Sequence, residues 1–167
     1  MNTTTSSIVP PGRQALSYAE LLVKEIDPAK FAHMPVAGLN HPAFTIGHLA
    51  MYPDRALGIL GRQDLARPKA GWDALFLAGC PCVEQDGRYP PKEEIVAHFV
   101  ERTGAVLAVA SEATEAQLAA PNPLEGRMRE LFPTVGAVLA FVLIGHPMMH
   151  LGQVSAWRRV IGMPPAM

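Results

Sequence analysis

Two histidines, His146 and His150, stand four residues apart in an uncharged stretch near the C-terminal end of the sequence. Residues i and i+4 share one face of an α-helix, so both imidazole rings can direct a nitrogen atom at a common point. Histidine pairs with this spacing recur in zinc sites. The same helical stripe carries mainly apolar residues, which predicts that the pair faces the core. These stripe residues are Leu139, Leu143, Gln153 and Trp157.

His48 is the candidate for a third ligand, because a metal site needs more than two protein ligands. Its predicted helical face also points inward, with Phe44, Met51, Tyr52 and Ile59 as neighbours. Three neutral imidazoles in a helical core would bind a divalent transition ion and leave coordination positions open for water or substrate. The alternative is that these histidines are hydrogen-bonded core residues that hold no metal.

The remaining histidines and the two cysteines give weaker indications. His33, His41 and His98 are expected to be exposed or structural rather than ligands. The outer face of the helix predicted around His98 also carries Glu94, Glu101 and Arg102. Cys80 and Cys82 form a CxC pair that could bind soft metals or act in redox chemistry. Two thiols in a loop are the simpler interpretation of this pair.

The composition excludes several classes of partner. The 167 residues include 14 basic and 15 acidic side chains, for a net charge of −1, so no basic surface for nucleic acid or anionic membrane is expected. Residues 135–145 are too short for the roughly 20 residues of a membrane span, which predicts a buried helix. The first 11 residues lack the features of a secretory signal and are predicted to be a loose leader. With only two cysteines, a cytoplasmic protein is expected.

The charged residues leave two long gaps, residues 31–53 and 131–157, which contain no Asp, Glu, Lys or Arg. Most of the histidines lie inside these gaps: His33, His41, His48, His146 and His150. A buried metal site needs surroundings without competing charges, because an unpaired charge is costly to bury. The gaps are therefore interpreted as the interior of a metal site rather than as a lipid-facing surface.

Helical periodicity predicts four main amphipathic helices and no strands, because apolar residues never alternate with a period of two. The predicted fold class is all-α, a four-helix bundle in a single domain over residues 1–167. Residues 62–91 are rich in glycine and proline and predict a long irregular connection between the second and third helices.

Caps and prolines set the predicted helix boundaries. The first helix begins after the loose leader, and Asn40 is predicted to cap a second helix over residues 41–60. Pro53 should kink this second helix, because proline removes a backbone hydrogen bond. The fourth helix is predicted over residues 134–161. Within it, Pro147 should either bend the helix or leave a backbone carbonyl to another donor.

Three segments make the sequence resemble the DinB-like metal-binding proteins, a superfamily of four-helix bundles. Residues 40–50, NHPAFTIGHLA, resemble the family segment that ends in GHLA, whose histidine is a ligand. Residues 89–91, Tyr-Pro-Pro before an acidic helix start, are similar to the family's entry into its third helix. Residues 146–153, HPMMHLGQ, resemble the family's HxxxHxGQ signature, with Pro147 where family members often have Glu.

This resemblance implies an up-down-down-up bundle, often a homodimer, with nickel, zinc or iron held by His48, His146 and His150. It also implies an enzyme for a small-molecule substrate, either a metal-dependent hydrolase or an S-transferase with a low-molecular-weight thiol as co-substrate. Gln153 is a candidate to orient a ligand or bound water, and Tyr52 a candidate proton donor, with simple packing as the alternative for each. The competing hypothesis is a non-catalytic metal- or ligand-binding bundle with a structural or stress-related role.

Overall fold

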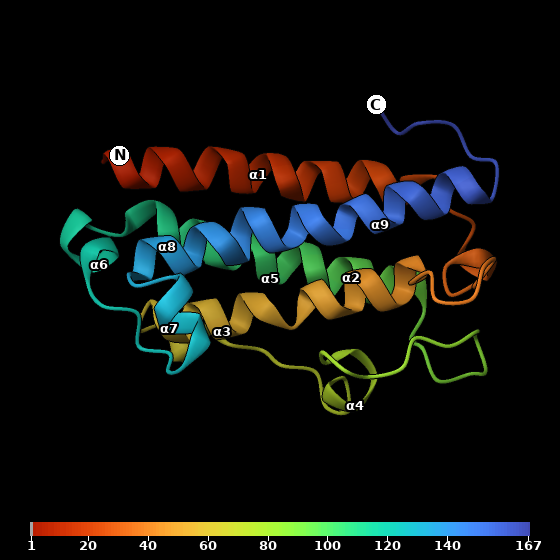
Figure 1. Cartoon of the computed structure of the whole chain (residues 1–167), viewed down its shortest axis with the longest axis horizontal. Helices are drawn as coiled ribbons and strands as arrows, with labels where there is room; N and C mark the ends of the chain where they lie inside the picture. The colour runs from red at the N-terminus through yellow and green to blue at the C-terminus, as the bar shows by residue number, and fades with distance from the viewer. Residues whose placement is uncertain (1) are drawn as a thin grey trace.

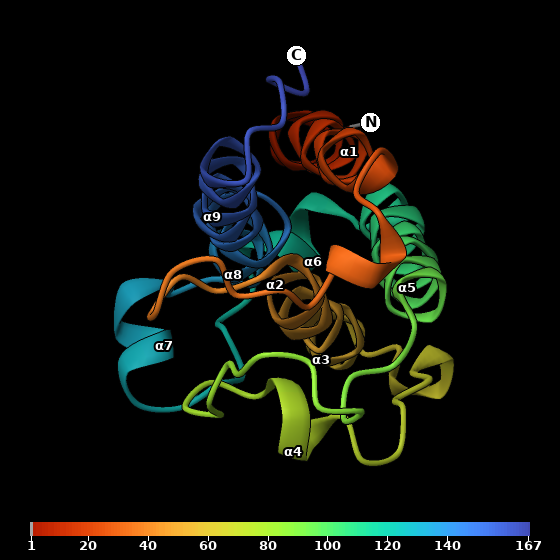
Figure 2. The same ribbon diagram turned by 90° about the vertical axis from the view of Figure 1, so that its right-hand side faces the viewer.

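The computed structural model describes residues 2–167, and these residues form helices with no β-strand, which confirms the predicted all-α class (Figure 1). The long elements are α1 (Thr3–Lys24), α2 (Pro42–Ala50) with α3 (Tyr52–Ile59), α5 (Lys92–Glu112), and α8 (Val135–Ala140) with α9 (His146–Val160). The short elements are η1 (Pro28–Lys30), η2 (Gln63–Leu65), α4 (Asp73–Phe76), α6 (Glu115–Ala119) and α7 (Arg127–Leu131). Viewed end-on, α1 packs between α5 and α9, and α2 packs against the same two helices from below (Figure 2).

The start of α1 corrects the prediction of a loose leader over residues 1–11, because this helix begins at Thr3. The side chain of Asn2 caps the helix by accepting a hydrogen bond from the Thr5 N–H at 2.8 Å. The same side chain donates to the carbonyl of Ala113, just after α5, at 2.9 Å. Tertiary contacts thus hold the first turns, although two prolines inside the helix lack backbone donors. The prolines are Pro10 and Pro11, and the buried residues before them include Ile8 and Val9.

The second predicted helix, over residues 41–60, is divided at Met51 into α2 and α3. Pro53 accounts for the break, because it has no N–H to donate to the preceding turn. The predicted cap is wrong by one residue, since His41 rather than Asn40 occupies the N-cap position. Proline follows at the first helical position, where its missing donor costs nothing.

His41 has a structural role at this cap and is fully buried. Its Nδ1 accepts a hydrogen bond from the Phe44 N–H at 3.1 Å, and its Nε2 lies 2.8 Å from the carbonyl oxygen of Val83. The ring must therefore be neutral, with the proton on Nε2. Burial lowers the pKa of His41 below its ordinary 6.5.

We expect His41→Asn to reduce the dependence of folding stability on pH. Asparagine caps helices without titrating in this range. The unfolded state binds a proton near pH 6.5, whereas the folded state resists it. The stability contributed by neutral His41 is therefore present above pH 6.5 and is lost as pH falls through the lowered folded pKa. Urea unfolding from pH 7.5 to 5 should show the free energies of unfolding of the two proteins converging as the pH drops. A parallel pH dependence of the two free energies would contradict the assignment of a neutral His41.

The fourth predicted helix is continuous but changes its hydrogen-bond pattern before Pro147. The five residues Phe141–Gly145 form a π-helix between α8 and α9, and the His146 N–H donates to the Phe141 carbonyl. This wider turn accommodates Pro147, whose backbone nitrogen has no hydrogen to donate. π-Turns of this kind are frequent at functional sites. The stretch Val135–Val160 is long and apolar enough to cross a membrane, but half of its most apolar window is buried in the protein. The core helices of soluble proteins have the same properties.

A buried ion pair joins α3 to α5. The Arg102 Nε donates to Asp54 Oδ1 at 2.7 Å, and a second guanidinium nitrogen donates to the Leu65 carbonyl at 2.6 Å. The other carboxylate oxygen of Asp54 accepts from the Arg67 N–H at 2.9 Å. Arg102 and His98 are both buried, so the predicted outer face of this helix is wrong at both positions. The carboxylate of Asp54, on the neighbouring helix α3, supplies the counter-charge that allows Arg102 to be buried.

The connection over residues 62–91 covers α2 and carries α4 (Figure 2). Its anchors are Trp72 and Phe76, which are buried against the core. A β-carbon on Gly47 of α2 would lie 2.6 Å from Cζ of the Phe76 ring, so only glycine allows this close approach. The connection is irregular, as predicted, and its position depends on contact between α4 and α2.

Candidate metal centre

The structure brings together the three histidines that the sequence singled out. His48 comes from α2, and His146 and His150 come from successive turns of α9. One nitrogen atom from each ring lies within 4.8 Å of the other two, as a shared metal ion would require. His48 and His146 are buried, with 5% and 6% of their surface exposed, and His150 is partly exposed.

A backbone carbonyl orients His48. Its Nδ1 lies 2.7 Å from the carbonyl oxygen of Phe76, the last residue of α4, so Nδ1 carries the proton and donates it. The lone pair of Nε2 is then free, and this atom lies 3.3 Å from Nε2 of His146. Metal-binding histidines usually have such a partner on the second ring nitrogen, because it fixes the tautomer and the direction of the ring.

Gln153 orients His150 in a similar way. Its Oε1 lies 3.4 Å from His150 Nδ1 and accepts a hydrogen bond from the Asn40 side chain at 3.2 Å. Gln153 is thus placed behind a candidate ligand, rather than in the open space where it would hold a substrate. Because Gln153 engages Nδ1, the Nε2 atom of His150 stays free to bind a metal ion.

The electrostatics of the cluster fit a metal ion. Burial, followed by the neighbouring His150 and His48, lowers the pKa of His146 to about 3. Burial is also the main cause that lowers the pKa of His48 and of His150. All three rings are therefore neutral at pH 7, the form that binds metals. Nδ1 of His146 is buried without a hydrogen-bond partner, whereas its Nε2 faces Nε2 of His48, so Nε2 is the atom that a cation among the three rings would engage.

A cavity of about 400 Å³ opens in front of the cluster. It is lined by Asn40, Phe44, His48, Tyr52, Ala78, Gly79, Cys80, His146 and His150. None of these residues carries a permanent charge. Tyr52 packs its ring 4.3 Å from that of His146, measured between ring centroids, and burial raises the pKa of Tyr52, so the phenol stays protonated near neutral pH.

The other sequence candidates lie outside this group. His33 is partly exposed, and its Nδ1 lies 3.1 Å from Oε1 of Glu84. His98 is buried against Trp72, with 4.9 Å between the ring centroids. Of the two cysteines, Cys80 lines the cavity in front of the histidines and Cys82 does not. Neither the contact of the Phe76 carbonyl with His48 nor that of Asn40 with Gln153 could be predicted from the sequence, because both depend on how distant segments pack.

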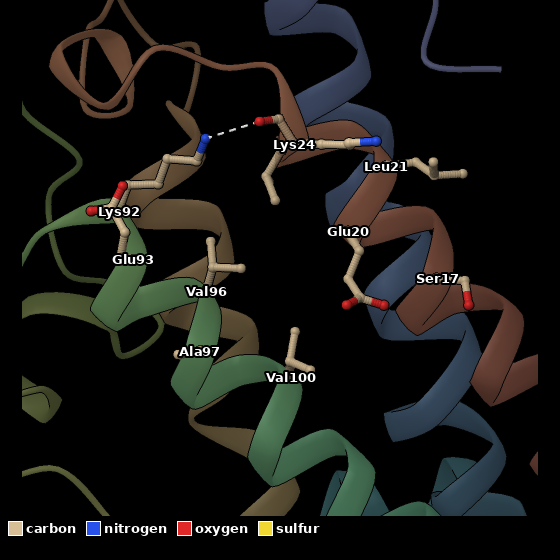
Figure 3. Close-up of a pocket in the computed structure, with 10 residues that line it drawn as sticks. Ser17, Glu20, Leu21, Lys24, Lys92, Glu93, Val96, Ala97 and Val100 are labelled. Carbon is tan, nitrogen blue, oxygen red and sulfur yellow. Dashed lines mark hydrogen bonds between the residues drawn. The ribbon is translucent and has the colours of Figure 1, made fainter.

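A larger cavity lies elsewhere, in a groove of about 830 Å³ between α1 and α5 (Figure 3). Its walls include Glu20 and Lys24 from α1 and Glu93 and Val96 from α5. The Lys92 ammonium closes one end by donating to the Lys24 carbonyl at 3.3 Å. The groove contains no histidine or cysteine, so the chemistry of the metal candidates is confined to the smaller cavity.

Comparison with known proteins supports the resemblance seen in the sequence. The family model of the DinB superfamily matches residues 13–154, which include all three histidines of the cluster. No curated protein and no solved structure gives a significant match. Because the matched region covers most of this chain, the chain belongs to the DinB superfamily.

Proposed function

We propose that this protein is a metal-dependent enzyme whose divalent transition metal is held by His48, His146 and His150. One observation carries the proposal: three neutral imidazoles direct nitrogen atoms within 4.8 Å of one another at the wall of a cavity. Nickel, zinc and iron all accept imidazole ligands. Three protein ligands leave a position for water or substrate, which is the pattern of catalytic rather than structural zinc sites.

The chain's own residues would prepare the site for this reaction. The Phe76 carbonyl and the Gln153 side chain hold Nδ1 of His48 and of His150, so that Nε2 of each ring stays available for a metal ion. Phe44 and Tyr52 form apolar walls that bind substrate and restrict water. A bound divalent cation would lower the pKa of a coordinated water or thiol and so supply a nucleophile near neutral pH.

The substrate is a small uncharged molecule, because no charged side chain lines the cavity. A charged group buried there would lose water without gaining a counter-ion. The reaction is of the S-transferase type with a low-molecular-weight thiol as co-substrate, or of the hydrolase type with water as the nucleophile. Electrophiles incubated with a neutral thiol, and with water alone, distinguish these two reactions.

Elemental analysis of protein purified without a nickel column tests the metal proposal. We expect about one equivalent of a transition metal per chain, and less than about a tenth of an equivalent in His146→Ala or His150→Ala. His33→Ala is the matched control, because this histidine is partly exposed and lies outside the cluster. Less than about a tenth of an equivalent in the unmodified chain would rule out the metal site. Metal without turnover would favour the non-catalytic bundle.

Gln153→Ala should weaken metal binding by about 10–100-fold, the usual effect of removing a hydrogen-bond partner from a ligating histidine. The expected cause is the loss of the contact that holds His150 Nδ1. Competition with a chromophoric chelator measures this change. Ser155→Ala on the same helix is the control, because this residue does not line the cavity. Equal affinities for the two variants would remove Gln153 from the site.

We also infer an up-down-down-up order for the long helices. The course of the ribbon supports it: α1 and the segment from α8 to α9 run one way along the molecule, and α2 with α3, like α5, runs the other (Figure 1).

A homodimer in the cytoplasm is part of the same proposal, and sedimentation of the purified chain tests the dimer. The net charge of −1 speaks against nucleic acid as a partner.

A further inference from the structure

The cavity in front of the histidines contains one further reactive group, the thiol of Cys80. This residue follows α4 and lines the cavity together with Ala78 and Gly79. It is partly exposed and free, and its Sγ lies 3.5 Å from the carbonyl oxygen of Asp73. The sequence analysis left the CxC pair without a role, and the structure separates its two members.

A second observation shows that the cavity is suited to hold a ligand. His146 lies in its wall, is 6% exposed, and has a buried Nδ1 atom without a hydrogen-bond partner. Buried polar atoms without partners are rare in proteins and often mark the position of a bound water, ion or ligand. The volume of about 400 Å³ is within the range of small-molecule sites. Cys80 therefore belongs to a built cavity rather than to an isolated surface loop.

We propose that Cys80 is a modification site, at which a small uncharged disulfide forms a mixed disulfide that fills the cavity in front of the three histidines. The Cys80 thiolate attacks one sulfur of the disulfide, an S–S bond to the protein forms, and the original S–S bond breaks. The departing thiolate takes up a proton from water near neutral pH. A free thiol reverses the reaction by attacking the mixed disulfide, so the modification acts as a reversible block on the site.

The two cysteines should differ in reactivity. Cys82 does not line the cavity, and burial raises its pKa, which reduces the fraction of reactive thiolate. The absence of charged lining residues selects an uncharged disulfide over an anionic one. The consequence for metal uptake rests on the proposed function, whereas the modification itself does not.

The experiment treats metal-free protein with the neutral reagent bis(2-hydroxyethyl) disulfide or with anionic oxidised glutathione. Intact-mass analysis and peptide mapping follow the adducts. We expect one adduct on Cys80 in the unmodified chain and in Cys82→Ser, and none at comparable times in Cys80→Ser. Labelling of Cys82 should be at least about tenfold slower, because burial raises its pKa and reduces the fraction of reactive thiolate. Equal rates at the two cysteines, or faster labelling by the anionic disulfide, would overturn the proposal.

A second measurement follows zinc uptake by the Cys82→Ser protein, before and after labelling, in competition with a chromophoric chelator. We expect uptake to be at least about tenfold slower in the labelled protein and to recover after reduction with dithiothreitol. Unchanged uptake after complete labelling of Cys80 would show that the adduct does not block the site. If the unlabelled protein takes up no zinc, the proposed metal function has failed, and the labelling rates still decide the modification.

Discussion

Gly47→Ala should destabilise the protein by about 1–2 kcal/mol and weaken metal binding at a site that Gly47 does not touch. The new β-carbon would lie 2.6 Å from Cζ of Phe76, whose ring is fully buried. Overpacking of this kind costs about 1–3 kcal/mol, partly offset by about 0.5–1 kcal/mol from the better helix propensity of alanine. Relief of the clash requires α4 to move away from α2.

Movement of α4 is what connects this substitution to the histidines. The carbonyl oxygen that accepts the proton of His48 Nδ1 belongs to Phe76 itself. Once this carbonyl withdraws, His48 can rotate and lose the orientation of its Nε2. We expect metal affinity to fall by about 10–100-fold, as for other lost partners of ligating histidines.

Urea unfolding and chelator competition measure the two effects of Gly47→Ala. The control is Gly104→Ala in α5, where a β-carbon would meet no atom within 4 Å. That change should leave metal binding unaltered and stabilise the protein by up to about 1 kcal/mol. If Gly47→Ala matched this control, α4 would not be positioning His48.

The three histidines could be predicted from the sequence because local geometry fixes much of their arrangement. The spacing of His146 and His150 places them on one helical face, whatever the rest of the fold does. The uncharged stretches around them and around His48 indicated burial. The groups that orient the rings could not be predicted. Every residue has a carbonyl, and only the docking of α4 on Gly47 selects that of Phe76.

The errors in the predicted elements have the same origin. Proline at positions 10 and 11 favours a break in a helix, yet burial and the contact from Asn2 to Ala113 keep α1 helical from Thr3. The charged pattern of α5 suggested an exposed face for Arg102, but Asp54 on another helix supplies its counter-ion. In each case a partner distant in sequence overrides the local pattern.

That ion pair leads to the largest change in stability that we expect. Asp54→Ala should lower the free energy of unfolding by about 3–5 kcal/mol, because it leaves the Arg102 guanidinium buried without a counter-charge. It also removes the acceptor of the Arg67 N–H, which ties the connection after η2 to α3. Helix propensity does not account for the loss, since alanine is the best helix former. Thermal unfolding should shift down by roughly 6–20 °C.

We expect this loss of stability because a buried charge is left unpaired, and not merely because a charge pair is lost. Two further variants test this. Asp64→Ala removes the partner of Arg62 from an exposed pair of similar geometry and should leave the unfolding midpoint unchanged. The double variant Asp54→Ala/Arg102→Met removes both buried charges and should recover most of the lost stability, because apolar replacements of buried pairs are often neutral. If the double variant were as unstable as Asp54→Ala, lost packing between α3 and α5 would be the cause. The unpaired arginine would then have little effect.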